Sequence, residues 1–76
     1  MSKSLTYKIL LHEEPEGGFT VTVPSLPGCV TYGKDLHEAV EMAKEAIEGY
    51  VEILKEQGDN IPDDTNTFES AITIAS

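Results

Sequence analysis

The side chains of this 76-residue chain that could take part in chemistry are fourteen carboxylates, two histidines and one cysteine. Carboxylates that hold two divalent cations about 4 Å apart can cleave phosphodiester bonds, but they must converge on one spot. The strands predicted below, at residues 5–11, 19–23, 29–32 and 70–75, contain no Asp or Glu. We therefore expect no enzymatic activity, no catalytic residues, no cofactor and no metal site.

Cys29 is the one thiol of the chain. A nucleophilic cysteine needs a histidine close by, and His12 and His37 are both distant from it in sequence. A cysteine that enters a strand after a tight turn is typical of a small buried side chain. A single free cysteine also suits a reducing compartment, so we expect a cytoplasmic protein.

Charge narrows the choice of partner. The chain has five lysines, no arginine, a net charge of −9 and a pI near 4.3. Nucleic acids and anionic membranes are held mainly by cationic side chains, so we expect no direct nucleic-acid binding and no membrane binding. No apolar run approaches the roughly 20 residues that span a bilayer. The natural partner of such a surface is a basic one.

The elements follow from periodicity. Apolar residues alternate over 5–11 and 19–23, which predicts a hairpin of two strands, and shorter strands are predicted at 29–32 and 70–75. Asp35 with Glu38 forms a capping-box pattern and Gly58 suits a helix C-terminus. Between them an apolar stripe recurs every three or four residues, formed by Leu36, Ala39, Val40, Ala43, Ile47, Tyr50, Val51 and Leu54. Glutamates occupy the opposite side.

This order predicts an α+β fold, β-β-β-α-β, with one antiparallel-type sheet packed on a single helix. Residues 1–76 form one domain of this kind. A chain this short has a thin core, and one cysteine cannot form an internal disulfide, so we expect self-association to a homo-oligomer.

One stretch resembles a known family. It comprises residues 18–33, with Pro24-Ser25-Leu26-Pro27-Gly28 at its centre, followed by Asp35-Leu36-His37-Glu38-Ala39. The chain is similar here to the N-terminal domain of HicB antitoxins, from Tyr7 to about Pro62. The resemblance implies a partial ribonuclease-H-like fold of three strands, a helix and a fourth strand.

The resemblance also implies a function. HicB proteins bind and neutralise HicA, a small basic toxin that cleaves mRNA, and many carry a C-terminal DNA-binding domain. This chain ends straight after the predicted fourth strand, so we expect a short form without that domain. The leading hypothesis is an antitoxin that binds and occludes a HicA-like toxin. A stand-alone homo-oligomeric module of unknown ligand and, remotely, a degraded ribonuclease-H-like enzyme are the alternatives.

Two acidic surfaces are candidates for contact with a toxin, and two further surfaces are candidates for self-association. The acidic loop residues Glu13, Glu14 and Glu16, with Tyr32 at a strand end, are predicted to meet the toxin, although exposed acids also serve solubility. The helix glutamates form a second acidic surface. The candidate oligomer interface is a second helix line at spacings of four, three and four, formed by Met42, Ala46, Gly49 and Ile53. An exposed strand edge is an equal candidate.

Overall fold

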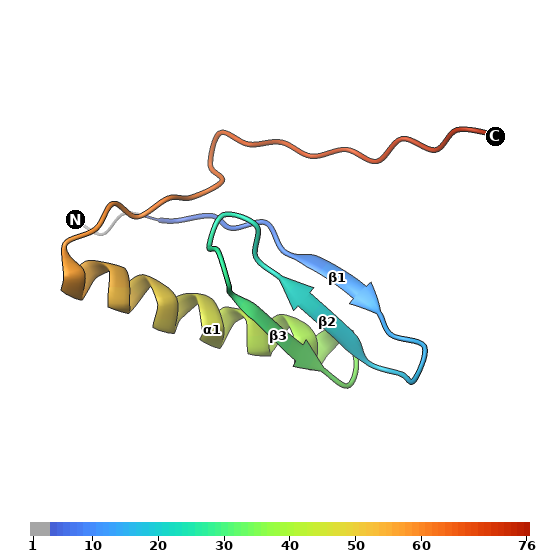
Figure 1. Ribbon diagram of the computed structural model, residues 1–76, viewed down its shortest axis with the longest axis horizontal. Helices are drawn as coiled ribbons and strands as arrows, with labels where there is room; N and C mark the ends of the chain where they lie inside the picture. The colour runs from blue at the N-terminus through green and yellow to red at the C-terminus, as the bar shows by residue number, and fades with distance from the viewer. Residues whose placement is uncertain (1–3) are drawn as a thin grey trace.

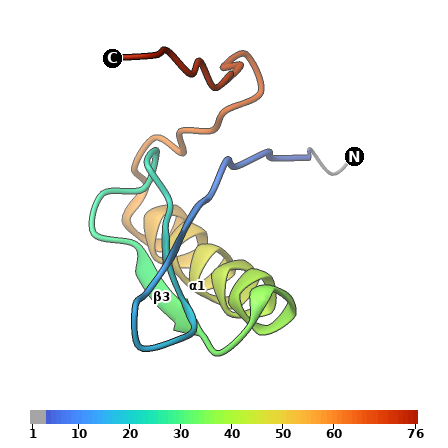
Figure 2. The same cartoon turned by 90° about the vertical axis from the view of Figure 1, so that its right-hand side faces the viewer.

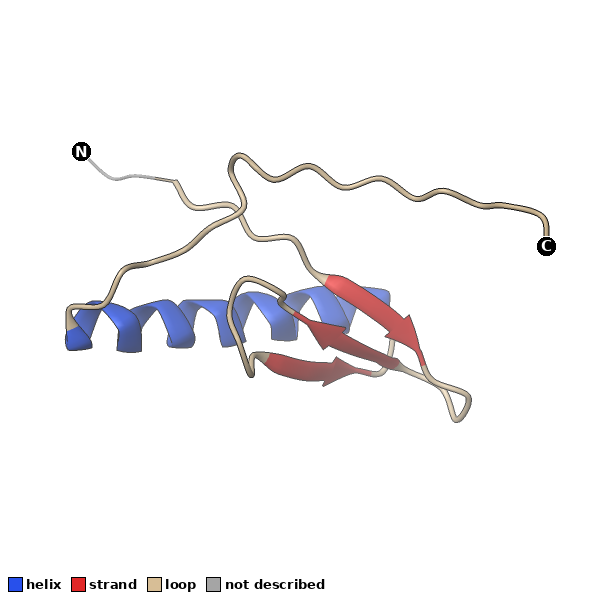
Figure 3. Ribbon diagram, turned by 45° about the horizontal axis from the view of Figure 1, so that its top comes forward, coloured by secondary structure: helices blue, strands red, loops and turns tan. Residues whose placement is uncertain are grey.

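Three antiparallel strands and one helix make up the fold (Figures 1 and 3). The computed structural model describes residues 4–76. The strands are β1 (Leu10–Glu13), β2 (Phe19–Thr22) and β3 (Val30–Gly33), in the sheet order β1-β2-β3, and the helix is α1 (Leu36–Gln57). One face of the sheet packs on α1, which confirms the predicted α+β arrangement of one sheet on one helix.

The first strand lies further along the chain than predicted. β1 spans Leu10–Glu13 in place of 5–11, because its ladder with β2 runs from the pair Leu10↔Thr22 to the pair Glu13↔Phe19. β2 ends at Thr22, and Pro24, which has no N–H group, follows two residues later. Residues 5–9 therefore approach the body without a paired strand of their own.

The helix begins and ends where its capping residues predict. The Asp35 carboxylate accepts a hydrogen bond of 2.8 Å from the Glu38 N–H, and the Glu38 carboxylate accepts one of 2.8 Å from the Lys34 N–H. At the other end Gly58 has φ +71° and donates to the Lys55 carbonyl. Only a residue that tolerates the left-handed region closes a helix in this way at low cost.

The core consists of two clusters between sheet and helix. Val21 packs with Ala39 and Ala43, and Val23 packs with Leu26 and Cys29. The apolar helix stripe was predicted to face the sheet, and for two of its members this prediction is wrong. Leu36 and Val40 are 56% and 45% exposed. Among the described residues the helix packs mainly on β3 and β2, so its flank on the β1 side is only partly covered, by Ile9 and Leu11.

The turn between β2 and β3 gives Leu26, Pro27 and Gly28 of the Pro24–Gly28 motif structural roles. Leu26 is completely buried, and the Cys29 N–H donates to its carbonyl across a turn in which Gly28 has φ +81°. The Pro27 carbonyl accepts a hydrogen bond of 2.8 Å from the Tyr50 hydroxyl of α1. The most specific part of the sequence motif thus joins the sheet to the helix.

Asp64 anchors the chain that follows the helix. Its side chain is 6% exposed, and it accepts hydrogen bonds from the Ser25 hydroxyl and from the Lys8 N–H, the latter at 2.8 Å. Its own N–H donates to the Thr6 carbonyl at 2.7 Å. These contacts place Asp64 where a longer β2 would have paired with residues 6–8. No local pattern in the sequence distinguishes this aspartate from its neighbours.

Replacement of Asp64 by asparagine is expected to lower the melting temperature at pH 7. The Ser25 hydroxyl and the Lys8 N–H hold the pKa of Asp64 below its ordinary value of 3.8. A lowered pKa means that the ionised form stabilises the fold: this contribution is complete above the unfolded-state pKa and is lost as the pH falls through the folded-state pKa. The difference between the native chain and Asp64→Asn should therefore shrink steadily as the pH of the melting experiment is lowered below the unfolded-state pKa of the carboxyl group.

Asp59→Asn is the matched control, because it removes the same charge from an exposed carboxylate. It should leave the melting temperature nearly unchanged throughout this pH range. An Asp64→Asn chain that melts like the Asp59→Asn chain at pH 7 would contradict the anchoring role.

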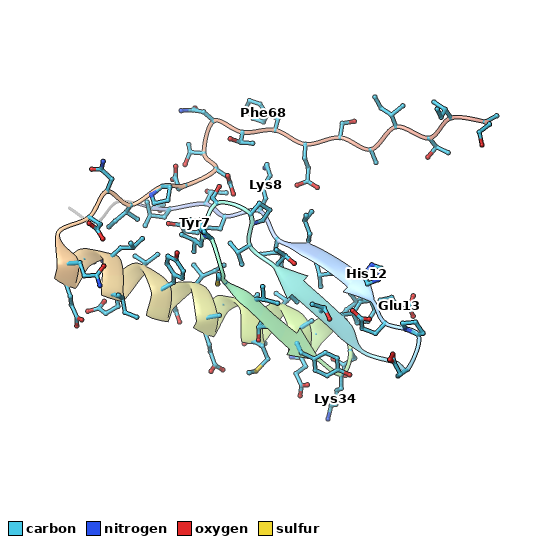
Figure 4. The ribbon with its side chains drawn as sticks, viewed as in Figure 1. Tyr7, Lys8, His12, Glu13, Lys34 and Phe68 are labelled. Atoms are coloured by element: carbon cyan, nitrogen blue, oxygen red, sulfur yellow. The ribbon has the colours of Figure 1, made fainter. Side chains whose placement is uncertain are left out.

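Residues 68–76 form an extended tail that leaves the body (Figure 1). The strand predicted at 70–75 has no hydrogen-bonded partner in residues 58–76 or elsewhere in the described chain. Phe68, the first residue of the tail, is 88% exposed and lies well above the sheet (Figure 4). The reason is geometric: a turn closed by the Thr67 N–H and the Asp64 carbonyl directs the chain away.

Candidate partner-binding surface

The sheet face opposite α1 is open to solvent. In the register of the three strands, Leu10, Thr22 and Val30 form one row. A second row comprises His12, Thr20 and Tyr32. Leu10, Val30 and Tyr32 are each half exposed or more. We call these six residues the open sheet face. Successive side chains of a strand point to opposite faces of the sheet, so these residues point to solvent and their neighbours in the strands point to the helix. The open sheet face nevertheless carries apolar groups.

Of the predicted acidic loop, Glu14 and the turn backbone lie beside Tyr32 at one end of this face, whereas Glu13 is in the row of Phe19 and Gly33, which faces α1. The Thr20 hydroxyl donates a hydrogen bond of 2.7 Å to the Glu14 carboxylate, which places that charge beside the row that Thr20 shares with Tyr32. The Tyr32 hydroxyl donates to the Gly17 carbonyl at 3.0 Å. We call Glu13, Glu14, Glu16 and Tyr32 the acidic turn; Figure 4 shows His12 and Glu13 at its base, at the end of β1.

Glycine makes this approach possible. A Cβ atom on Gly18 would lie 1.9 Å from the Tyr32 hydroxyl oxygen, so only a hydrogen atom fits between turn and ring. The turn itself is closed by hydrogen bonds of 2.9 Å between Glu14 and both Gly17 and Gly18. The backbone of the acidic turn, the Glu14 carboxylate and the Tyr32 ring are therefore held in a defined arrangement.

The candidate oligomer line on α1 is mostly open. Met42 and Ile53 are 36% and 54% exposed, and a Cβ atom on Gly49 would meet nothing within 4 Å. Ala46 differs, because it packs partly against the second core cluster. The flank of α1 formed by Met42, Gly49 and Ile53 is therefore exposed to solvent in the single chain.

The residues considered for nucleophilic chemistry lie in different places. Cys29 is 6% exposed, as expected for a small buried side chain, and burial raises the pKa of its thiol, which disfavours the reactive thiolate. His12 lies on the open sheet face and His37 is exposed in the first turn of α1. Within residues 4–76, no three His, Cys, Asp or Glu side chains are grouped so that they could hold a metal ion.

Sequence reasoning missed Leu10 and Val30 as surface residues. The signal was present, because each interrupts the alternation of its strand: Leu10 follows Ile9, and Val30 follows Cys29. An apolar residue in the outward register predicts a covered or binding face.

In the described residues, no helix is long and apolar enough to cross a membrane.

Comparison with known proteins adds a family. The family described as the HicB-like antitoxin of bacterial toxin–antitoxin systems matches residues 7–74. A UPF0150 protein of Thermoplasma acidophilum is 42% identical over 60 residues, covering 79% of this chain and 87% of that protein. A UPF0150 protein of Archaeoglobus fulgidus is 45% identical over 51 residues, covering 67% and 74%. Antitoxin HicB 1 of Photorhabdus laumondii is 35% identical over 60 residues, covering 79% and 39%.

Proposed function

The chain belongs to the HicB-like antitoxin family, and on this premise we propose that it binds and occludes a small, basic, HicA-like ribonuclease toxin. An antitoxin acts by binding, so the proposed role needs no catalysis by this chain. The toxin cleaves mRNA, and the proposed encounter therefore takes place in the cytoplasm. Direct binding to nucleic acid is not part of the proposal, because the net charge is −9.

The acidic turn is the observation that carries the proposal. It places the Glu14 carboxylate beside the row of Thr20 and Tyr32 and continues into the apolar open sheet face. A nuclease that holds RNA has a cationic groove, and a surface that combines negative charge with exposed apolar groups competes for such a groove. Opposite potentials speed and orient the encounter, whereas the apolar contacts hold the complex together.

The mechanism we propose is steric and electrostatic. Glu14, fixed by Thr20, takes the place of a phosphate in the groove of the toxin, and Tyr32 packs beside it. Leu10 and Val30 cover the neighbouring surface of the toxin and exclude substrate. The open sheet face is broad and faces away from α1, so a toxin can be seated there without displacing any element.

The test is a charge-neutral triple variant of the acidic turn. Glu13→Gln, Glu14→Gln and Glu16→Gln together are expected to weaken binding to a small basic HicA-like toxin by at least about tenfold, since each lost charge contact contributes on the order of 1 kcal/mol. Affinity is measured by calorimetry, and inhibition by mRNA cleavage.

The matched control neutralises three exposed carboxylates of α1, through Glu41→Gln, Glu45→Gln and Glu56→Gln. It changes the net charge by the same amount and should alter affinity by less than about twofold at 0.15 M salt. Equal losses in the two triples would show that bulk charge, not the acidic turn, binds the toxin. A native chain that does not bind the toxin at micromolar concentration would refute the proposed function altogether.

A further inference from the structure

An apolar groove of about 590 Å³ lies between α1 and the segment that leads into β1. Tyr7 and Ile9 line it from that segment. Val40, Ile47 and Val51 line it from the helix. β1 is an edge strand, so its outer backbone groups have no partner in the sheet. A strand added to that edge would lay its inward side chains into the groove.

The exposed flank of the helix indicates that something is missing from this groove. Val40 belongs to the apolar stripe of α1, yet it is 45% exposed because the sheet does not extend over it. The helix packs mainly on β3 and β2, which leaves the side below β1 only partly covered. One more strand beyond β1 would complete the layer.

The tail has the character of such a strand. Phe68, Ile72 and Ile74 share one register, and they are 88%, 88% and 79% exposed. Nine extended residues span about 30 Å, whereas the groove follows α1 from Val40 to Lys55, about 23 Å. The match to the family reaches residue 74, so it includes most of the tail.

Charge at the groove also suits the tail. Lys44 and Lys55 line it, and Glu48 and Glu52 balance them. Glu69 is the one charged side chain of residues 68–76. A body of net charge −9 repels a second copy of itself, but a nearly neutral strand can enter a balanced groove.

We propose that two copies of this chain exchange tails. Residues 68–76 of each copy add as a strand to the outer edge of β1 and the segment before it in the other copy, with Phe68, Ile72 and Ile74 in the groove. Exchange about a two-fold axis closes the dimer and leaves neither groove empty.

The route of the chain favours a second copy over the tail of the same chain. Asp64 is held by Lys8 and Ser25, and Ser25 lies just after β2. From there the chain turns outward, and the sheet and the segment before β1 lie between the tail and α1 (Figures 1 and 2). To reach its own groove the tail would have to cross over that segment.

The first test is the mass of full-length chains in sedimentation equilibrium. The native chain should sediment at twice its mass of 8.3 kDa. Ile72→Lys with Ile74→Lys is expected to raise the dimer dissociation constant at least about a hundredfold, because two lysines cannot be buried among apolar groups. Ala71→Lys with Thr73→Lys adds the same charge on the outward side of the tail and should leave the dimer intact.

The second test distinguishes exchange from folding back. In a Cys29→Ala background, an Ile72→Cys chain mixed with a Val40→Cys chain should form a disulfide between copies, whereas an Ile53→Cys chain in place of the second should not. A native mass of 8.3 kDa would overturn the proposal. So would a dimer that resists the Ile72→Lys pair but dissociates with Gly49→Leu, or a double Ile72→Cys, Val40→Cys chain that closes only within itself.

Discussion

Leu26→Ala is expected to leave a large fraction of the protein unfolded at 25 °C. Leu26 is completely buried, and Val23, Cys29 and Tyr50 belong to the same cluster. Removal of a buried leucine side chain costs about 2–5 kcal/mol, because the cavity that remains does not fully collapse. A chain of this size is stable by only about 5 kcal/mol, so this one change removes most of the free energy of unfolding.

Urea unfolding followed by circular dichroism at 222 nm measures the effect. The matched control is Leu36→Ala, which deletes the same atoms from a side chain that is 56% exposed, and its effect should stay within about 0.5 kcal/mol. A Leu26→Ala chain with the urea midpoint of the native protein would show that the turn between β2 and β3 is not part of the core.

This result bears on what the family motif means. Pro24 lies just past the end of β2, Ser25 holds Asp64, Leu26 fills the core and Gly28 supplies a positive φ. The contacts of Ser25, Leu26 and Gly28 are therefore structural, and the Pro24–Gly28 motif is a signature of the fold. The proposed function depends on other residues, those of the acidic turn, and all of them lie outside Pro24–Gly28.

The helix was predictable to the residue because its signals are local. Asp35 and Gly58 act within one turn of the helix, through bonds to Glu38 and Lys55. The strands were less predictable because pairing is not local. Whether residues 5–9 form a ladder depends on Pro24, which lies far along the chain, and no alternation within 5–11 carries that information.

The tail illustrates the same limit. Alternation over 70–75 predicts a strand, and the structure shows an extended segment without a partner. A local pattern specifies which side chains share a face, but the edge that receives them is a property of the folded body. If the receiving edge belongs to a second copy, as we propose, no single chain contains the pairing that the pattern predicts.

Part of the candidate surface was accessible from sequence, and part was not. The charge of Glu13, Glu14 and Glu16 is evident, but the place of Glu14 beside the row of Tyr32 follows from its hydrogen bond with Thr20 and from the pairing of Thr20 with both β1 and β3. That register depends on two turns and on which face is buried. Composition therefore predicts that the partner is positively charged. The structure adds where exposed apolar side chains lie next to the acidic residues.

Gly33→Ala is expected to destabilise the protein by about 1–3 kcal/mol or more, although it adds a single methyl group. A Cβ atom on Gly33 would lie 2.2 Å from the Ala39 nitrogen and 2.3 Å from its Cα atom. Both are helix backbone atoms, which cannot rotate away as the end of a side chain does. The first turn of α1 must move off β3, and that movement opens the cluster of Val21 with Ala39.

Gly49→Ala makes the same chemical change on the exposed flank of α1, where a Cβ atom meets nothing within 4 Å. Alanine is the better helix former by about 1 kcal/mol, so this variant should be more stable than the native chain in urea unfolding. Opposite signs for the two glycines would establish that β3 and α1 are in backbone contact at Gly33. If Gly33→Ala were as stable as the native chain, that contact would be wrong. If instead Gly49→Ala lowered stability in a concentration-dependent way, a second chain would have to pack at Gly49, and the helix flank would replace the tail as the site of self-association.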